Sequence, residues 1–201
     1  MNFTQSTLVL LKPDAVARGL VGEIISRFER AGLSIQAMKL IHPSIEFARG
    51  HYPTTDVQLS QMGSKTLSTY RELNIDPMEE LGSEDPIEIG RMIHEWNAEF
   101  LSSGPVVALV LKGMHAVRKV RAICGKTMPL YAEPGTIRGD YSSTSPAVAN
   151  LEKAAVFNLL HASDDENDPE EPTKEIEYWF TPQEIINFRL LIVRGLSKAG
   201  G

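Results

Sequence analysis

The stretch STLVLLKPDAVARGLVGEIISRFERAGLSIQAMKLI, residues 6–41, decides the fold. It opens with the short apolar run Ser6–Leu11, soon followed by Pro13, a pattern typical of a buried strand. Apolar side chains then recur at i, i+3, i+4 and i+7 between residues 21 and 31, which indicates one buried face of a helix. Gly32 is a common helix stop. The stretch therefore begins with a predicted strand and a predicted helix.

A second strand is predicted for residues 33–41, because apolar and polar side chains alternate there. Its apolar positions are Leu33, Ile35 and Ala37. Further along, PVVALVLKG at 105–113 is apolar throughout, as in a strand that is covered on both faces. A helix is expected over 114–125, and AVFNLLH at 155–161 is the fourth predicted strand. The inward positions of that helix are Val117, Val120 and Cys124.

This order of elements predicts an α/β fold of the ferredoxin-like kind, a βαββαβ antiparallel sheet with its helices on one face. We expect a single domain, residues 1–201, with an insertion at about residues 53–103. The inserted stretch is mostly polar with scattered turn signals and predicts one to three short helices over the core. Residues 133–145 predict a loop. Residues 181–195 predict a C-terminal helix with threonine as its N-cap and proline at its first position.

Composition limits the classes of protein that the chain can belong to. Its 201 residues carry a net charge of −6, which disfavours a broad electrostatic grip on nucleic acid or on an acidic membrane. The single cysteine excludes an intrachain disulfide and a cysteine-rich metal site. No apolar run approaches the ~20 residues that a membrane span needs, and no signal peptide is recognisable. We therefore expect a cytoplasmic protein that binds neither membranes nor nucleic acid.

The segment FNLLHASDDE, residues 157–166, raises the question of chemistry, because an apolar run ends there in His161. One interpretation is a core histidine at the end of a strand. The other is a nucleophile, since a neutral imidazole can attack phosphorus when a partner fixes its tautomer and stabilises the positive charge that develops. Glu175 lies shortly beyond and is a candidate for that partner. The residues alone leave both interpretations open.

Four other side chains are of the kinds that bind phosphate. They are Lys12, Arg121, Thr127 and Arg138. Each alone is a weak signal, because a lysine after a strand or an arginine on a helix is usually solvated. Arg138 is a stronger signal for a phosphate site, since Gly135 and Gly139 lie close to it in the sequence and allow the backbone to bend. Together with the histidine, these residues predict a phosphate site.

Taken together, these stretches resemble the nucleoside diphosphate kinase family. Residues 6–41 are similar to the N-terminal third of that family, and GPVVALVLKG, VRAICGKTMP and PGTIRGD match its middle in order. NLLHASD is similar to its active-site signature. The resemblance implies a ping-pong reaction in which His161 accepts the γ-phosphoryl group of a nucleoside triphosphate, mainly ATP. A nucleoside diphosphate then takes the group from the phosphohistidine.

The resemblance also implies which residues hold the nucleotide. Lys12 would contact the γ-phosphoryl oxygens, and Arg138 would bridge the β–γ region. Arg121 and Thr127 would hold the β- and α-phosphates. Asn158 would bind the ribose 3′-hydroxyl.

Further roles concern the histidine and the metal ion. Tyr52 would stand beside the histidine with its hydroxyl near the transferred group, and Ser163 and Glu175 would orient the ring. The implied cofactor is Mg²⁺, held mainly by the nucleotide phosphates and by water. Asp164 is the protein group expected near the ion, through water.

The sequence departs from the family where a phenylalanine normally stacks on the base, and Tyr70 is the substitute that we expect. The family implies a homo-oligomer, usually a hexamer or tetramer. Two other functions stay open at this point. One is a nucleotide-binding or interaction module without catalysis, and the other is an RNA binder. The RNA binder is disfavoured, because the strands lack the exposed aromatic and basic residues that such sheets use.

Overall fold

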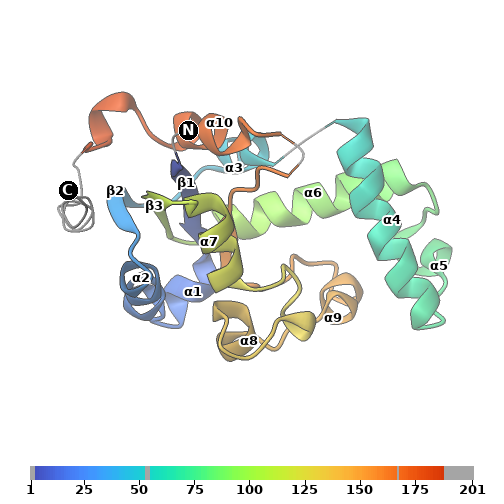
Figure 1. Cartoon of the computed structure of the whole chain (residues 1–201). Coiled ribbons are helices and arrows are strands. Elements are labelled where there is room, and N and C mark those ends of the chain that lie inside the picture. The colour runs from blue at the N-terminus through green and yellow to red at the C-terminus, as the bar shows by residue number, and fades with distance from the viewer. Residues whose placement is uncertain (1–2, 53–54, 167, 188–201) are drawn as a thin grey trace, which may run out of the picture.

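The computed structural model describes residues 3–52, 55–166 and 168–187 (Figure 1). Four strands form one antiparallel sheet in the order β2-β3-β1-β4. Their bounds are Thr4–Leu11 for β1, Ser34–Ile41 for β2, Val106–Met114 for β3 and Leu160–Ala162 for β4. Strand order and pairing confirm the predicted ferredoxin-like sheet. The fourth strand is shorter than expected, because residues 155–159 are irregular.

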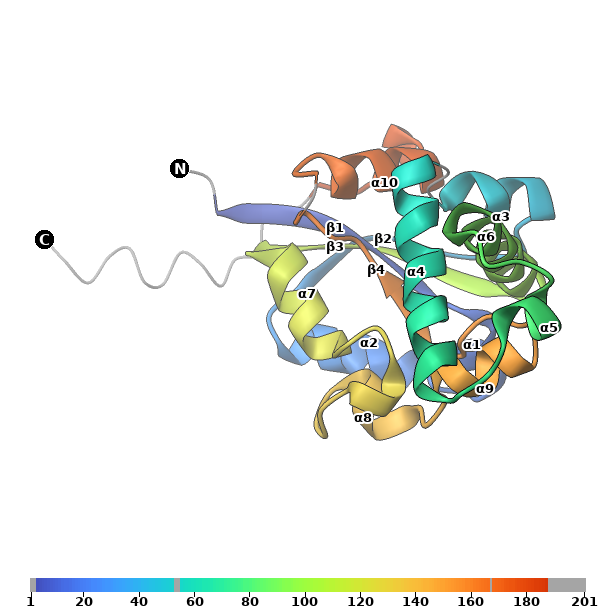
Figure 2. The ribbon, with the colours of Figure 1, turned by 90° about the vertical axis from the view of Figure 1, so that its right-hand side faces the viewer.

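Helices cover both faces of this sheet, whereas the sequence suggested one. On one face lie α2 (Val21–Arg30) and α7 (Ala116–Cys124). On the other lie α3 (Ile45–His51), α6 (Pro86–Ser102) and α10 (Glu171–Trp179). Figure 2 shows α10 above the strands and α7 and α2 below them. The first turn after β1 is the short helix α1 (Pro13–Ala17).

Alternation along the central strands divides the core in two. Successive side chains of a strand point to opposite faces, so Val9 and Leu11 pack with Phe28 of α2. Leu8 and Leu10 pack on the other face with residues of α6 and α10. The first six residues of β3 are all buried, which confirms a strand covered on both sides. The two central strands, β1 and β3, are thus packed against core residues on both faces of the sheet.

The second strand breaks the alternation that its sequence suggests. Ile35 pairs with Leu111 and Ala37 pairs with Val110, so Gln36 is an extra residue opposite the partner strand. This β-bulge turns Ala37 to the second core, while Ile35 stays against the first. The predicted common face for these two residues is therefore wrong.

The inserted region is more ordered than the sequence predicts. It contains three helices, α4 (Asp56–Glu72), α5 (Pro77–Leu81) and α6. Two of these helices have 17 residues, not the short lengths expected. α4 crosses α6 where Gly63 lies against Pro86 and Gly90 lies against Leu59 (Figures 1 and 2). The absence of side chains at both glycines permits this close approach.

Short helices occupy the region before and after β4. The predicted loop at 133–145 contains α8 (Ile137–Tyr141), and α9 (Pro146–Leu151) and the single turn η1 (Pro129–Tyr131) lie nearby. After α10 the chain forms only the turn η2 (Pro182–Glu184), which Thr181 caps as predicted. Residues 185–187 are not helical, so the predicted C-terminal helix is wrong as far as residue 187. The rest of that prediction lies outside the described residues.

Candidate active site

His161 lies in the middle of β4, opposite Leu10 of β1. Its side chain is 26% exposed, and its Nε2 atom lies 2.8 Å from Oε1 of Glu175 on α10. Nε2 itself is buried and is not aligned for a hydrogen bond, so a small rotation is needed to form one. With Nε2 turned toward the carboxylate, Nδ1 is the nitrogen left to act as a nucleophile.

Glu175 is held as an anion beside this ring. Its side chain is 10% exposed, and Ser163 Oγ donates a hydrogen bond to its second oxygen, Oε2. Burial opposes ionisation, but the charge that His161 carries when protonated and its close ring nitrogen outweigh it and lower the pKa of Glu175 to about 2. Ser163 is fully buried and also accepts a hydrogen bond from the backbone of Leu8, which ties the carboxylate to β1.

A strained backbone turn leads into His161. Leu159 has φ of 70°, a left-handed conformation that is rare for a side chain of this size. Its N–H donates to Oδ2 of Asp14 at 3.0 Å, and its carbonyl accepts from the N–H of Lys12 at 2.9 Å. The segment just after β1 therefore holds the turn that delivers the histidine.

Lys12 and Asn158 meet across this junction. Nζ of Lys12 donates to Oδ1 of Asn158 at 2.9 Å, and Nδ2 of Asn158 donates to the carbonyl of Thr127 at 3.0 Å. Burial is the main cause that lowers the pKa of Lys12 to about 8. The lysine is thus a desolvated cation that is positioned for an incoming anion.

Arg138 braces the backbone around the same place. It lies near the start of α8, which Thr136 caps, and it is buried. Its guanidinium donates to the carbonyls of Gly125, Asn158 and Leu160 at 2.7, 3.1 and 2.7 Å. Three of its five N–H groups are therefore engaged with protein, and the remaining two can meet a phosphate.

Arg121 and Thr127 are more loosely attached. Arg121 pairs with Oδ2 of Asp164 at 2.8 Å, and both side chains are partly exposed. Oδ1 of Asp164 accepts from the N–H of Glu166 at 3.0 Å. Thr127 is exposed and is linked to the site through its backbone only. The predicted residues thus form separate contacting groups. Lys12, Arg138 and Asn158 meet at the turn before β4, and His161, Ser163 and Glu175 meet between β4 and α10. Arg121 pairs with Asp164.

His51 completes the cluster, and little in the sequence singled it out. Its ring lies edge-on to that of His161, with centroids 4.6 Å apart at 89°, and 4.9 Å from the ring of Tyr52. Trp179 donates its indole N–H to Nδ1 of His51 at 3.2 Å. The one sequence signal for His51 was that it adjoins Tyr52. Burial raises the pKa of the Tyr52 hydroxyl.

The aromatic surface near Lys12 differs from the expected one. Tyr70 is fully buried on α4, and its hydroxyl donates to the carbonyl of Asn150, so it cannot stack on a base. The 47% exposed ring of Phe157 stacks on Phe100 at 4.6 Å, and Nζ of Lys12 lies 5.9 Å from the centre of the Phe100 ring. No periodic pattern marks this pair in the sequence.

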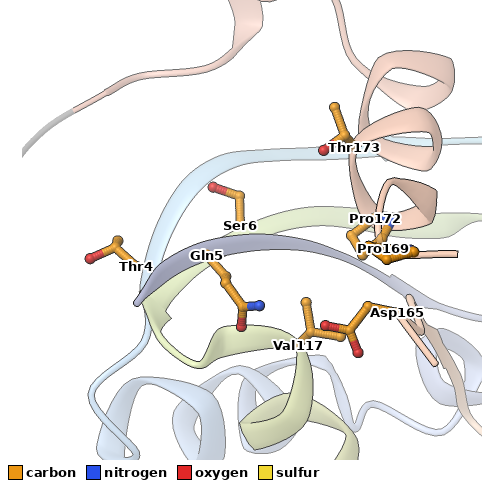
Figure 3. Close-up of a pocket in the computed structure, with 8 residues that line it drawn as sticks. All are labelled: Thr4, Gln5, Ser6, Val117, Asp165, Pro169, Pro172 and Thr173. Carbon is orange, nitrogen blue, oxygen red and sulfur yellow. The ribbon is translucent and has the colours of Figure 1, made fainter. Parts of the chain in front are cut away.

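A pocket of about 300 Å³ lies elsewhere, between the start of β1, α7 and α10 (Figure 3). Its lining residues are Thr4, Gln5, Ser6, Val117, Asp165, Pro169, Pro172 and Thr173. This lining includes none of the catalytic candidates and no cationic side chain, and Asp165 is acidic, so the pocket does not suit a polyphosphate. No helix within the described residues is long and apolar enough to span a bilayer.

Comparison with known proteins agrees with this geometry. A family model described as nucleoside diphosphate kinase matches residues 5–60 and 87–185. A nucleoside diphosphate kinase of Pyrobaculum aerophilum is 50% identical over 182 residues, which cover 90% of this chain and 98% of the relative. The stretch that the family model leaves unmatched within the fold, residues 61–86, covers most of α4 and all of α5.

Two solved structures are similar over nearly their whole length. A crystal structure of the NDP kinase from Pyrobaculum aerophilum has a TM-score of 0.88 and 49% identity, and the match covers 92% of this chain and 100% of that one. A transition-state mimic of the nucleoside-diphosphate kinase from Borrelia burgdorferi, with bound vanadate and ADP, has a TM-score of 0.74 and 30% identity. That match covers 96% of each chain.

Proposed function

The chain belongs to the nucleoside diphosphate kinase family, and we propose that its phosphoryl transfer runs through Nδ1 of His161. The enzyme transfers the γ-phosphoryl group of a nucleoside triphosphate to a nucleoside diphosphate. The observation that carries the residue assignment is the partly exposed histidine with its Nε2 2.8 Å from the buried carboxylate of Glu175.

The geometry favours nucleophilic attack by this ring. A bond forms between Nδ1 and the γ-phosphorus, the bond from that phosphorus to the β–γ bridging oxygen breaks, and ADP leaves when ATP is the donor. The imidazole becomes positively charged as it bonds to phosphorus, and the Glu175 anion stabilises that charge. The second half-reaction reverses these steps with another nucleoside diphosphate as acceptor.

Cations supply the remaining stabilisation. Lys12 is desolvated beside Asn158, where its charge acts strongly on phosphoryl oxygens. Arg138 offers its two remaining N–H groups, and Arg121 can exchange its pairing with Asp164 for a phosphate. We assign Asn158 to the ribose 3′-hydroxyl, as the family resemblance implies. Its amide binds Lys12 and the Thr127 carbonyl and has a second N–H for the sugar. Positioning and charge neutralisation are the main demands of this reaction.

The residues suit a Mg²⁺ ion that the nucleotide itself carries. Mg²⁺ prefers oxygen ligands and retains water, and the one three-residue cluster of metal-binding type among the described residues has two histidines and one carboxylate. Asp164 has both oxygens engaged, with Arg121 and with a backbone N–H. Oδ2 becomes free when Arg121 turns to a phosphate, and it would then meet the hydrated ion through water. Bound Mg²⁺ would neutralise charge on the β- and γ-phosphates.

We further propose a homo-oligomer, a hexamer or tetramer. The edge strand β2 exposes Met38 and Leu40, at 57% and 65%, which a second copy could cover. The single-domain organisation and the cytoplasmic location stay predictions.

Labelling with γ-³²P ATP tests the proposed chemistry. The wild-type enzyme should acquire an acid-labile, base-stable label that ADP or dGDP removes. His161→Ala should abolish both label and turnover, while His42→Ala, a change of an exposed histidine, should leave both intact. A labelled His161→Ala protein would overturn the assignment of the nucleophile. A wild-type protein that binds nucleotide but never labels would favour the binding module.

A further inference from the structure

The proposed reaction does not use His51, a partly buried histidine beside the nucleophile. His51 ends α3, and its ring packs edge-on against the ring of His161. Nε2 of His51 is buried and has no hydrogen-bond partner within the described parts of the chain. An unpaired buried donor or acceptor is costly, so this atom is expected to meet a partner at some stage of the reaction.

Trp179 fixes which nitrogen of His51 carries the proton. An indole N–H is only a donor, so Nδ1 of His51, at 3.2 Å, must be the acceptor. The proton therefore resides on Nε2, which acts as a donor. Burial lowers the pKa of His51 to about 3, helped by the charge of His161 when that ring is protonated, so the His51 ring is neutral at physiological pH.

The same tautomer argues against a metal ion in this cluster. A ring nitrogen of each histidine and a carboxylate oxygen of Glu175 lie within 4.8 Å of one another, a spacing that could hold a metal. Coordination through Nε2 of His51 would require the proton on Nδ1, where it would face the indole N–H of Trp179. Two donors would then point at each other, so the arrangement opposes a metal and favours Nε2–H as a hydrogen-bond donor.

A nearby acceptor with spare capacity is Glu175, whose carboxylate lies within 4.8 Å of a ring nitrogen of His51. Its two oxygens offer about four lone-pair sites, of which Ser163 takes one, while Nε2 of His161 is close but misaligned. We infer that His51 is a positioning residue, whose Nε2–H donates to the Glu175 carboxylate in the nucleotide-bound enzyme and turns it into line with His161. Catalytic hydrogen bonds are often long without substrate and tighten when it binds.

One helix supports both ends of this relay. Glu175 and Trp179 are one turn apart on α10, so their side chains lie on the same face. His51 bridges them from α3. The inference rests on the proposed role of His161, because the orientation of the carboxylate matters only if that ring is the nucleophile.

Two substitutions of similar volume separate positioning from packing. His51→Gln keeps a donor near Nε2, whereas His51→Met has none, and both lose the Nδ1 acceptor. We expect His51→Met to lower kcat by about 10-fold with KM for both nucleotides little changed, since a hydrogen bond to a charged group is lost. His51→Gln should recover most of that loss. His94→Gln is the matched control, because His94 also contacts the Tyr52 ring.

Equal kcat values for the Gln and Met variants, at equal thermal stability, would overturn the inference and leave His51 a packing residue. Long-range ¹H–¹⁵N correlation spectra of the wild-type enzyme supply an arm that needs no variant to fold. Between about pH 6 and 8, Nδ1 of His51 should be unprotonated and Nε2 protonated. An unprotonated Nε2 would contradict the inference. Failure of the proposed function shows instead as absent labelling of wild-type enzyme, whatever the His51 tautomer.

Discussion

Nζ of Lys12 and Oδ1 of Asn158 lie 2.9 Å apart, although 146 residues separate them in the chain. The contact joins the end of β1 to the approach of β4. It places a desolvated cation beside the turn that carries His161, so the charge and the nucleophile are fixed relative to one another. Substitutions around this junction should therefore separate binding, chemistry and stability.

Glu175→Gln tests the stabilising anion. The amide keeps the shape of the side chain but cannot stabilise the imidazole charge that forms in the transition state. We expect kcat to fall by about 100-fold, measured in a coupled assay at saturating nucleotide. Glu177→Gln, an exposed change on the same helix, should leave kcat within about twofold. Equal activity of the two variants would contradict the role of Glu175.

Lys12 should make nucleotide binding pH-dependent. With its pKa at about 8, the lysine is charged below that pH and neutral above it. KM should therefore rise above about pH 8, and Lys12→Arg should flatten the profile because arginine stays charged. A profile for Lys12→Arg that rises as steeply as the wild type would place the titration elsewhere.

The same group affects stability with a definite sign. Between pH 8 and 10.5 the unfolded chain still holds a proton that folded Lys12 has released. The free energy of unfolding should rise with pH across this window. Denaturant titrations of the wild type and Lys12→Met, compared at both ends, measure this contribution, which should be missing in the variant.

Arg138→Lys should destabilise the fold. A lysine cannot reach three carbonyls that diverge from one guanidinium. We expect the free energy of unfolding to fall by about 3 kcal/mol, measured by urea denaturation, and kcat to fall as the turn before His161 shifts. Arg118→Lys, on the exposed face of α7, should change stability by less than about 0.5 kcal/mol. Equal stability of the two variants would contradict the bracing role.

Gly63→Ala should destabilise the fold, although replacing glycine by alanine within a helix usually stabilises a protein. Alanine normally stabilises a helix relative to glycine by about 1 kcal/mol, but a Cβ at Gly63 would overlap the Pro86 carbonyl. We expect a net loss of about 2 kcal/mol in thermal or urea unfolding. Gly22→Ala in α2, with nothing within 4 Å of the added atom, is the matched control and should stabilise. Stabilisation by both changes would show that α4 and α6 do not pack tightly.

Much of the fold could be predicted from the sequence, because the spacing of apolar residues indicates buried strands and helix faces. The third strand and α7, with Val117, Val120 and Cys124 buried, are as predicted. α4 was harder, because its buried face includes Gly63 and Thr66, which apolar periodicity does not count. The bulge at Gln36 depends on pairing with β3 and leaves no local signal.

The site was predictable where a short motif surrounds the reactive group. Lys12 contacts Asn158, and His161 follows Asn158 by three residues, while the roles that the family resemblance implies for them stay predictions. The position of His51 was not readable, because its partner Trp179 is 128 residues away. Tyr70 was misjudged, because an aromatic residue on a polar helix gives no sign of whether it faces the core.

Pairing between β1 and β4 closes a loop that includes most of the described chain. The entropy of closing so long a loop must be overcome before these contacts can form. Lys12 and His161 lie on the two sides of this closure. A refolding chain would therefore stay inert until this pairing forms, and the return of catalysis would report the docking of β4 on β1.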